Sequence, residues 1–255
     1  IPVSQQHLSS LPANNEVFVI KKIAIRSTQE KNDTKNEIKL LSTLKLEYII
    51  QYFAYFYDGP SKSMCIAMEH ASGGDLAAKI QRQRARRTLF TNKRITVWFQ
   101  QMSKAIQYCH SHNILHRDSK PGNIFLAKDG TIKIGDFGSA MESHELPQIR
   151  EMTELVSRFY RAPEIILGDT PTYGIDVWSA GCCLFEMCTG KLPFMGNHNN
   201  GMLRYFQELC GRFPKKVLTR SKNTSKHFNS SYDFVCRTEN TTMNSKSFGK
   251  KIMKN

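Results

Sequence analysis

The feature that most constrains this chain is the segment His-Arg-Asp-Ser-Lys-Pro-Gly-Asn at residues 116–123, which is followed by Asp-Phe-Gly at residues 136–138. Between these motifs, two short apolar segments at residues 124–126 and 131–134 flank an Asp-Gly pair. An Asp-Gly pair between apolar segments predicts a β-hairpin. Because a hairpin reverses the chain, we expect the Asp of the second motif to lie beside the Asn of the first.

The two motifs contain the residue types that phosphoryl transfer from ATP requires. The carboxylate of Asp118 is a candidate base for the proton of a substrate hydroxyl, and Lys120 can place a cation against the transferred phosphate. The amide oxygen of Asn123 and the carboxylate of Asp136 are hard oxygen ligands that suit Mg²⁺. We therefore predict that Asp118, Lys120 and Asn123 are catalytic, and that Asn123 and Asp136 bind the metal.

With these motifs the chain resembles a eukaryotic Ser/Thr protein kinase from about residue 17 to about residue 235. Residues 116–123 match the catalytic loop of that family, with Ser119 at the usual Leu position, and Ala-Pro-Glu at residues 162–164 matches the motif that closes its activation segment. The resemblance implies transfer of the γ-phosphoryl group of ATP to Ser or Thr hydroxyls of protein substrates, with ATP and Mg²⁺ as cofactors. The alternative is a pseudokinase or truncated kinase fragment that acts as a binding scaffold with little activity.

The resemblance divides between two branches of the family. Residues 17–138 resemble the NIMA-related kinases, notably in Gly-Gly-Asp-Leu-Ala-Ala-Lys-Ile at residues 73–80. Residues 139–235 resemble the pre-mRNA-processing branch near the dual-specificity Tyr-regulated kinases, notably in Leu-Val-Ser-Arg-Phe-Tyr-Arg-Ala-Pro-Glu at residues 155–164. The motifs therefore leave the subfamily open.

A Lys and a Glu in the N-terminal part are the candidate residues for binding the ATP phosphates. Lys21 ends the strand-like run Phe-Val-Ile-Lys, and Glu37 lies in a segment whose apolar residues have helical spacing. In the kinase family such a Lys holds the α- and β-phosphates and pairs with such a Glu. Lys21 fits the family pattern better than Lys22 because it directly follows Val-Ile. Taken alone, both charges would usually be solvated surface groups.

Residues 65–71 match the last strand of the small lobe and the hinge in that family. The resemblance places Met68 behind the adenine, and the backbone of Glu69 and Ala71 at its hydrogen-bonding edge. The other interpretation of this segment is an ordinary core strand.

No glycine precedes Gly59, so the glycine-rich loop that covers the ATP phosphates in this family is not found. We therefore expect weaker ATP binding and slower transfer, because backbone N–H groups that would orient the phosphates are missing.

The expected fold is α+β and two-lobed, with the kinase domain at residues 1–235 truncated at both ends. A small β-rich N-lobe, itself incomplete, would occupy residues 1–70, and a larger, mainly α-helical C-lobe would occupy residues 71–235. Apolar residues at helical spacing predict one buried helix that includes residues 95–109 and a second at about residues 175–188.

Four positions match family residues that stack between the two lobes: Leu41, Tyr52, His116 and Phe137. If they stack here, closure of the lobes depends on that contact, and His116 is structural and not a base.

Two predictions concern carboxylates near the activation segment. Glu154 stands where the Tyr-regulated relatives have a phosphorylated Tyr, so it could pair with Arg158 or Arg161. The other interpretation of Glu154 is a solvated loop residue. Glu164 pairs in the family with an Arg from the last helices, and we expect it to lack that partner because the chain stops before a recognisable equivalent.

The net charge of +14 suggests anionic partners, but it is concentrated near the C-terminus. Residues 236–255 are rich in Asn, Ser, Thr and Lys and are interpreted as a basic, flexible tail. The basic run formed by Arg82, Arg84, Arg86 and Arg87 is interpreted as a solvated helix end or loop. Its alternative is contact with an acidic substrate or nucleic acid, although we expect no nucleic-acid partner for the chain as a whole.

The seven cysteines include no Cys-x-x-Cys pair, and several lie in apolar helical patterns. We therefore expect reduced core cysteines in an intracellular protein of the cytoplasm or nucleus. No apolar run has the length of a membrane span. We expect a monomer that does not engage membranes.

Overall fold

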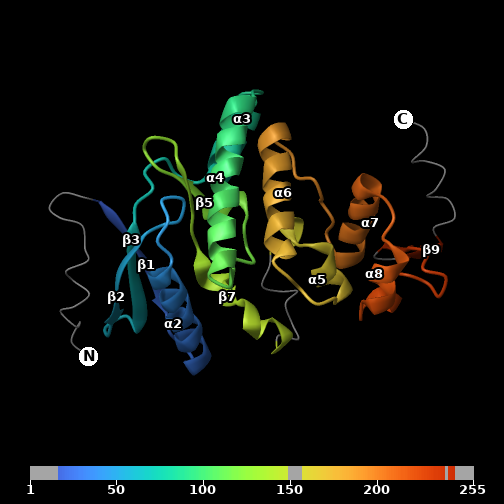
Figure 1. The fold of residues 1–255 in the computed structure, drawn as a ribbon, viewed down its shortest axis with the longest axis horizontal. Helices are drawn as coiled ribbons and strands as arrows, with labels where there is room; N and C mark the ends of the chain where they lie inside the picture. The colour runs from blue at the N-terminus through green and yellow to red at the C-terminus, as the bar shows by residue number, and fades with distance from the viewer. Residues whose placement is uncertain (1–16, 149–156, 239–240, 245–255) are drawn as a thin grey trace.

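The computed structural model describes residues 17–148, 157–238 and 241–244, and it contains a small β-rich part followed by a larger helical part (Figure 1). The small part is a three-stranded antiparallel sheet in the order β1-β3-β2. Its strands are β1 (Phe18–Ala24), β2 (Tyr52–Asp58) and β3 (Ser63–Glu69). The α+β, two-lobed fold expected from the sequence is therefore confirmed.

The helix α2 (Thr28–Thr43) accompanies this sheet and begins with a capping box. Ser27 Oγ accepts a hydrogen bond from the Glu30 N–H at 3.1 Å, and Glu30 Oε2 accepts one from the Ser27 N–H at 3.2 Å. These contacts give partners to backbone N–H groups that a helix start leaves unpaired. The helix buries Ile38, Leu41 and the carboxylate-bearing Glu37.

The larger part is built from helices and short two-stranded ribbons. Its helices are α3 (Leu76–Ala85), α4 (Asn92–Ser111), α5 (Pro163–Leu167), α6 (Gly174–Thr189), α7 (Asn199–Cys210) and α8 (Lys215–Arg220). Its ribbons pair β4 (Ile114–Leu115) with β7 (Met141–Glu142), β5 (Ile124–Leu126) with β6 (Ile132–Ile134), and β8 (Val235–Thr238) with β9 (Thr241–Asn244). Short 3₁₀ turns connect them: η1 (Pro121–Asn123), η2 (Phe137–Ser139), η3 (Ser143–Gln148), η4 (Arg158–Tyr160) and η5 (Thr224–Lys226).

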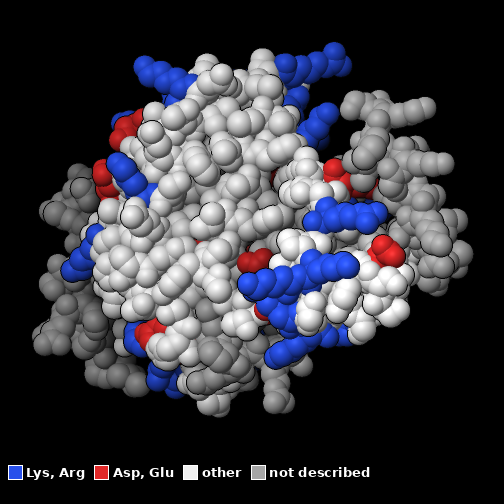
Figure 2. All heavy atoms as spheres, turned by 45° about the vertical axis from the view of Figure 1, so that its right-hand side comes forward, with Lys and Arg blue, Asp and Glu red and all other residues white. Residues whose placement is uncertain are grey.

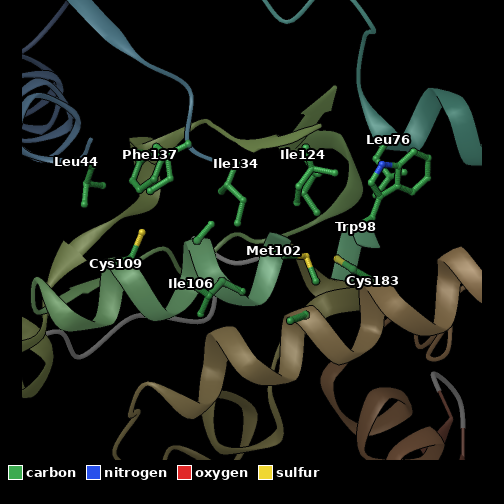
Figure 3. Packing of buried hydrophobic residues seen from close by; sticks show 14 of the residues in the cluster. Leu44, Leu76, Trp98, Met102, Ile106, Cys109, Ile124, Ile134, Phe137 and Cys183 are labelled. Carbon is green, nitrogen blue, oxygen red and sulfur yellow. The ribbon is translucent and has the colours of Figure 1, made fainter. Parts of the chain in front are cut away.

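The main hydrophobic core lies between α4, α6 and the β5–β6 hairpin (Figure 3). The buried face of α4 carries Trp98, Met102, Ile106 and Cys109, and α6 contributes Cys183. Both buried helices were predicted from apolar spacing, and both are present within a few residues of the predicted bounds. The hairpin predicted around the Asp-Gly pair is also present as β5 and β6.

The prediction of core cysteines holds for some of the seven and is wrong for others. All seven thiols are free, and four of them, Cys65, Cys109, Cys182 and Cys183, are buried. Burial raises the pKa of Cys109 and of Cys182 to about 12. Two others, Cys188 and Cys210, are exposed, because they lie near the C-terminal ends of α6 and α7.

Residues 236–255 were predicted to be a flexible tail. Of that segment the structure describes residues 236–238 and 241–244, which lie in the paired strands β8 and β9. Pairing gives backbone groups hydrogen-bond partners whatever the polarity of the side chains. Predictions about residues 1–16, Glu154 and residues 245–255 lie outside the described residues. Among the helices that the structure describes, none has both the length and the apolar character to cross a bilayer.

Candidate active site

Lys21 on β1 connects the two parts of the molecule. Its Nζ donates hydrogen bonds to Glu37 Oε1 of α2 at 2.7 Å and to Asp136 Oδ1 at 2.8 Å. The neighbouring Lys22 instead pairs with Asp58 of β2 at 2.8 Å. Because successive side chains of a strand point to opposite faces, only one of the two lysines can reach this carboxylate pair.

The charges of this cluster stabilise one another. Burial alone would raise the pKa of Asp136, but the hydrogen bond and the positive charge of Lys21 outweigh it and hold that pKa below its ordinary value. Burial would likewise lower the pKa of Lys21, yet Glu37 and Asp136 together raise it. Both groups therefore stay charged at neutral pH, with a cation between two carboxylates.

Asp136 reaches this position through an unusual backbone conformation. Its φ of 58° and ψ of 73° lie in the left-handed region, which residues other than Gly adopt rarely, although Asn, Asp and His do so more often than the rest. The next residue, Phe137, is fully buried, and the Gly135 N–H donates to the Asn123 carbonyl at 2.9 Å. At Gly138 an added Cβ would lie 3.4 Å from both Asp136 Oδ1 and Glu37 Oε2. The left-handed conformation and the hydrogen bond from Gly135 to Asn123 therefore define the turn that directs the carboxylate toward Lys21.

The segment before Asp118 is anchored by the buried carboxylate of Asp176 at the start of α6. Asp176 accepts hydrogen bonds from the backbone N–H groups of His116 and Arg117 at 2.9 and 2.8 Å. The His116 ring is engaged at both nitrogens, with the Gly135 carbonyl at 3.1 Å and with the Asp118 N–H at 3.3 Å. These contacts fit a structural role for His116, whose ring holds the Asp118 segment in position.

Asp118, Lys120 and Asn123 form a second polar cluster. Lys120 Nζ donates to Asp118 Oδ2 at 2.7 Å. Asn123 Nδ2 donates to the same oxygen at 3.1 Å and to the Asp118 carbonyl at 2.9 Å. The three predicted catalytic residues are therefore in direct contact, although they come from a loop and a 3₁₀ turn.

Ser157 is also a member of this cluster, although the sequence motifs did not predict it. Its N–H donates to Asp118 Oδ1 at 3.2 Å, and its Oγ accepts a hydrogen bond from Lys120 Nζ at 2.8 Å. A small hydroxyl residue just before Arg-Phe-Tyr-Arg is a weak signal, and nothing in its spacing connects it with a loop so far away in the chain.

The oxygen atoms of Asn123 and Asp136 are of the kind that suits Mg²⁺. Because the Asn123 amide nitrogen donates to Asp118, its amide oxygen is the atom left for a cation. The Asp136 side chain is 45% exposed, so it can be reached. In the part of the chain that the structure describes, no group of three or more His, Cys, Asp or Glu residues could hold a metal alone. Such a sparse protein set suits Mg²⁺, which proteins commonly bind through one or two side chains together with substrate phosphates.

The predicted adenine-binding residues lie at the junction of the two parts. Met68 is half-buried and packs against the cluster formed by Ile38, Met64 and Ile66. The Glu69 carboxylate pairs with Lys133 at 2.8 Å, and the Glu69 N–H donates to the Gln51 carbonyl at 2.8 Å, so both of these groups are already engaged. Ala71 follows the end of β3 and is half-buried.

The predicted stack between the lobes is supported by the packing. The rings of His116 and Phe137 are 4.8 Å apart in an edge-to-face arrangement. Phe137 and Leu41 belong to one buried cluster, against which Tyr52 packs. The contact therefore joins β2 and α2 of the small part to the loop that carries Asp118.

Comparisons with known proteins match both the fold and the motifs. The model of the protein kinase domain matches residues 9–253. The serine/threonine-protein kinase prpf4B of Dictyostelium discoideum is 50% identical over 143 residues, which is 55% of this chain and 17% of that protein. The serine/threonine-protein kinase Nek5 of Mus musculus is 39% identical over 181 residues, covering 71% of this chain and 28% of the relative.

The serine/threonine-protein kinase prp4 of Schizosaccharomyces pombe is 35% identical over 237 residues, covering 89% of this chain. That match spans 48% of the relative, so the chain covers less than half the length of these three proteins. Both branches suggested by the sequence motifs are represented among them.

Proposed function

The chain belongs to the protein kinase domain family, and on that premise we propose that it transfers the γ-phosphoryl group of ATP to Ser or Thr hydroxyls of protein substrates. The observation that carries the proposal is the convergence on Asp118 of Lys120 and Asn123, next to the turn that places Asp136 on Lys21. This set supplies a base, cations for the phosphates and oxygen ligands for a metal.

In this mechanism Asp118 accepts the proton of the attacking hydroxyl. Its Oδ2 is held by Lys120 and Asn123, so the carboxylate is oriented before a substrate arrives. Lys120 also places positive charge where the transferring group becomes more negative. Lys21 binds phosphate oxygens of the nucleotide, and Glu37 keeps its ammonium group in position.

Mg²⁺ held by Asn123 and Asp136 would neutralise charge on the phosphates when the nucleotide is bound. We assign the adenine to the junction of the two parts, with Met68 behind it and the backbone of Glu69 and Ala71 at its edge. The proposal also includes an intracellular location, because the cysteines are all free, and a monomeric state.

The pseudokinase alternative receives no support from the comparisons, since the relatives reported above are described as kinases. The deciding experiment measures transfer from labelled ATP to a basic protein substrate in the presence of Mg²⁺. We expect Asp118→Asn to lower the rate by about 10²–10⁴-fold, the usual contribution of a general base.

Asp129→Asn is the matched control, because Asp129 is an exposed turn residue whose contacts are with Thr131. Its rate should equal that of the unchanged chain. No transfer by the unchanged chain, or equal rates for the two variants, would contradict the proposal.

A further inference from the structure

A basic groove lies between α3 and the start of α4, outside the candidate active site. Its volume is about 410 Å³. Three cations line one side of it: Lys79 and Arg82 of α3, and Arg86 at the C-cap of that helix. Their spacing puts side chains on one face of a helix. Arg94 of α4 lines the groove as well. Figure 2 shows Lys and Arg side chains projecting from the upper end of the molecule, where Figure 1 places α3.

The positive charge of this groove is uncompensated. Among the described residues that line it, none is Asp or Glu. Within the described part of the chain, no ion pair joins any of its four cations to a carboxylate. The Arg82 Nε–H donates to the Ala78 carbonyl, which fixes the side chain and leaves the other guanidinium nitrogens for a ligand. Four such cations around one groove repel one another, and an anionic ligand relieves that repulsion.

The floor of the groove is apolar and held in place. Trp98 is 3% exposed, and its Nε1–H donates to the Gly130 carbonyl at 2.8 Å. The Phe90 ring packs edge-to-face on Trp98 with centroids 5.0 Å apart. Leu89 is 57% exposed beside them, so an apolar side chain of a ligand has a surface to contact. The groove therefore combines carboxylate-binding groups with a preformed apolar contact.

The same observations favour a peptide over a nucleic acid. Single-stranded nucleic acids bind largely by stacking bases on accessible aromatic faces. Here the Trp98 ring is buried, and the Arg94 guanidinium lies over it at 5.5 Å from the ring centroid. An extended peptide needs no such face, since its carboxylates can bind the arginines while an apolar neighbour contacts Leu89.

We propose that the groove between α3 and α4 binds an acidic peptide segment of a partner protein, one in which Glu or Asp alternates with apolar residues. The proposal does not depend on phosphotransfer, because binding can be measured without ATP. The groove would recruit a protein to a surface separate from the residues around Asp118.

The test measures fluorescence anisotropy of a labelled peptide of alternating Glu and Leu residues titrated with the full chain. The matched peptide of alternating Gln and Leu and a single-stranded oligouridine are the comparison ligands. We expect the acidic peptide to bind at least about tenfold more tightly than either. Raising the salt from about 0.05 M to about 0.5 M should weaken that binding, since screening lengths fall below the dimensions of the groove.

Charge-reversed variants separate the groove from the overall charge of the chain. Arg82→Glu with Arg86→Glu should weaken acidic-peptide binding by about tenfold or more, because it removes two cations and adds two repulsive charges. Lys215→Glu with Lys216→Glu makes the same change in net charge on exposed positions of α8 and should leave binding unchanged.

A third variant, Leu89→Gln, should weaken binding without any change of charge. Unchanged melting temperatures of the variants would show that they fold. Equal weakening by the two charge reversals, undetectable binding of the acidic peptide, or tighter binding of oligouridine would overturn the proposal.

Discussion

At the scale of single residues, the site depends on charged and polar side chains that meet across long stretches of chain, such as Lys21 with Glu37 and Ser157 with Lys120. Lys21 and Glu37 were found because each stands in a short pattern, a strand end and a helical segment. Their ion pair at 2.7 Å is the pairing that the kinase resemblance implies. Ser157 was missed because its contacts with Asp118 and Lys120 cross a large stretch of chain, and no local pattern encodes such a contact.

The Lys21 cluster predicts a stability change that depends on pH. Lys21→Met leaves the buried Glu37 without its cation and should lower the free energy of unfolding at pH 7 by about 2 kcal/mol. This is less than the roughly 3–5 kcal/mol of a fully buried pair, because the Lys21 side chain is 33% exposed. Lys22→Met, which affects the more exposed pair with Asp58, should cost clearly less than Lys21→Met, because solvent screens that pair.

The direction in which stability changes with pH follows from the pKa shifts of Asp136 and Lys21. The pKa of Asp136 is lowered, so its stabilising contribution is present above the ordinary value of 3.8 and is lost as the pH falls through the folded value below it. The pKa of Lys21 is raised, so its contribution persists at least to pH 10.5. Urea unfolding of the Lys21→Met variant and of the unchanged chain should be compared from pH 7 downward. The difference between their free energies of unfolding should shrink below pH 3.8. A constant difference would contradict this account.

Ser157 should affect turnover more than folding. Ser157→Ala removes the acceptor for Lys120 Nζ but keeps the backbone contact with Asp118, so we expect the rate of phosphoryl transfer to fall by about tenfold, equivalent to one hydrogen bond to a charged group. Ser157→Thr keeps the hydroxyl and should restore most of the rate. Equal rates for the Ala variant and the unchanged chain would show that this hydroxyl does not position Lys120.

At the scale of helices and strands, apolar spacing predicted the elements that build the core. The buried faces of α4 and α6 each repeat at helical intervals, so their existence could be read from the sequence. The β8–β9 hairpin could not, because the sequence over residues 235–244 shows no regular alternation of apolar and polar residues. Exposure of Cys188 and Cys210 also depends on where a helix ends, which is the least predictable property of an element.

The start of α2 is a test of local helix energetics. Ser27→Ala removes the side-chain acceptor for the Glu30 N–H, so the free energy of unfolding should fall by about 1 kcal/mol, the usual value of an N-cap. The measurement is chemical denaturation at pH 7, and Ser42→Ala, near the other end of the helix, is the control. If Ser27→Ala costs no more than Ser42→Ala, the capping box is not stabilising.

A substitution of Glu164 in α5 should stabilise the fold, whereas the substitutions above should destabilise it. Burial raises its pKa, and no ion pair with Glu164 is found in the described part of the chain, where Arg220 pairs with Asp169 instead. Glu164→Gln should therefore raise the free energy of unfolding at pH 7 by about 1 kcal/mol, because a neutral amide is less costly to bury than a carboxylate.

The gain in stability from Glu164→Gln should vanish below pH 4.5. A carboxyl whose folded pKa is raised destabilises the fold only at pH values where it would otherwise be ionised. Thermal unfolding across this pH range checks both statements. A loss of stability at pH 7 would mean that the Glu164 carboxylate has a cationic partner.

At the scale of the whole molecule, two groups of side chains meet across the junction of the small and large parts. One group is the Lys21–Glu37 pair of β1 and α2, and the other surrounds Asp118 in the large part. Asp136 contacts the first group, and the backbone bond from Gly135 to Asn123 ties its turn to the second. The sequence motifs predicted the members of both groups except Ser157, but only the fold shows that the groups are joined through this turn.

The contact between Lys21 and Asp136 is tested most directly by measuring Mg²⁺-dependent transfer from labelled ATP by the Lys21→Met and Lys22→Met variants. The two lysines are neighbours on β1, and only Lys21 contacts Asp136. We expect Lys21→Met to lower transfer by about 10²-fold or more, while Lys22→Met keeps a rate close to that of the unchanged chain. Equal rates for the two variants would contradict this expectation.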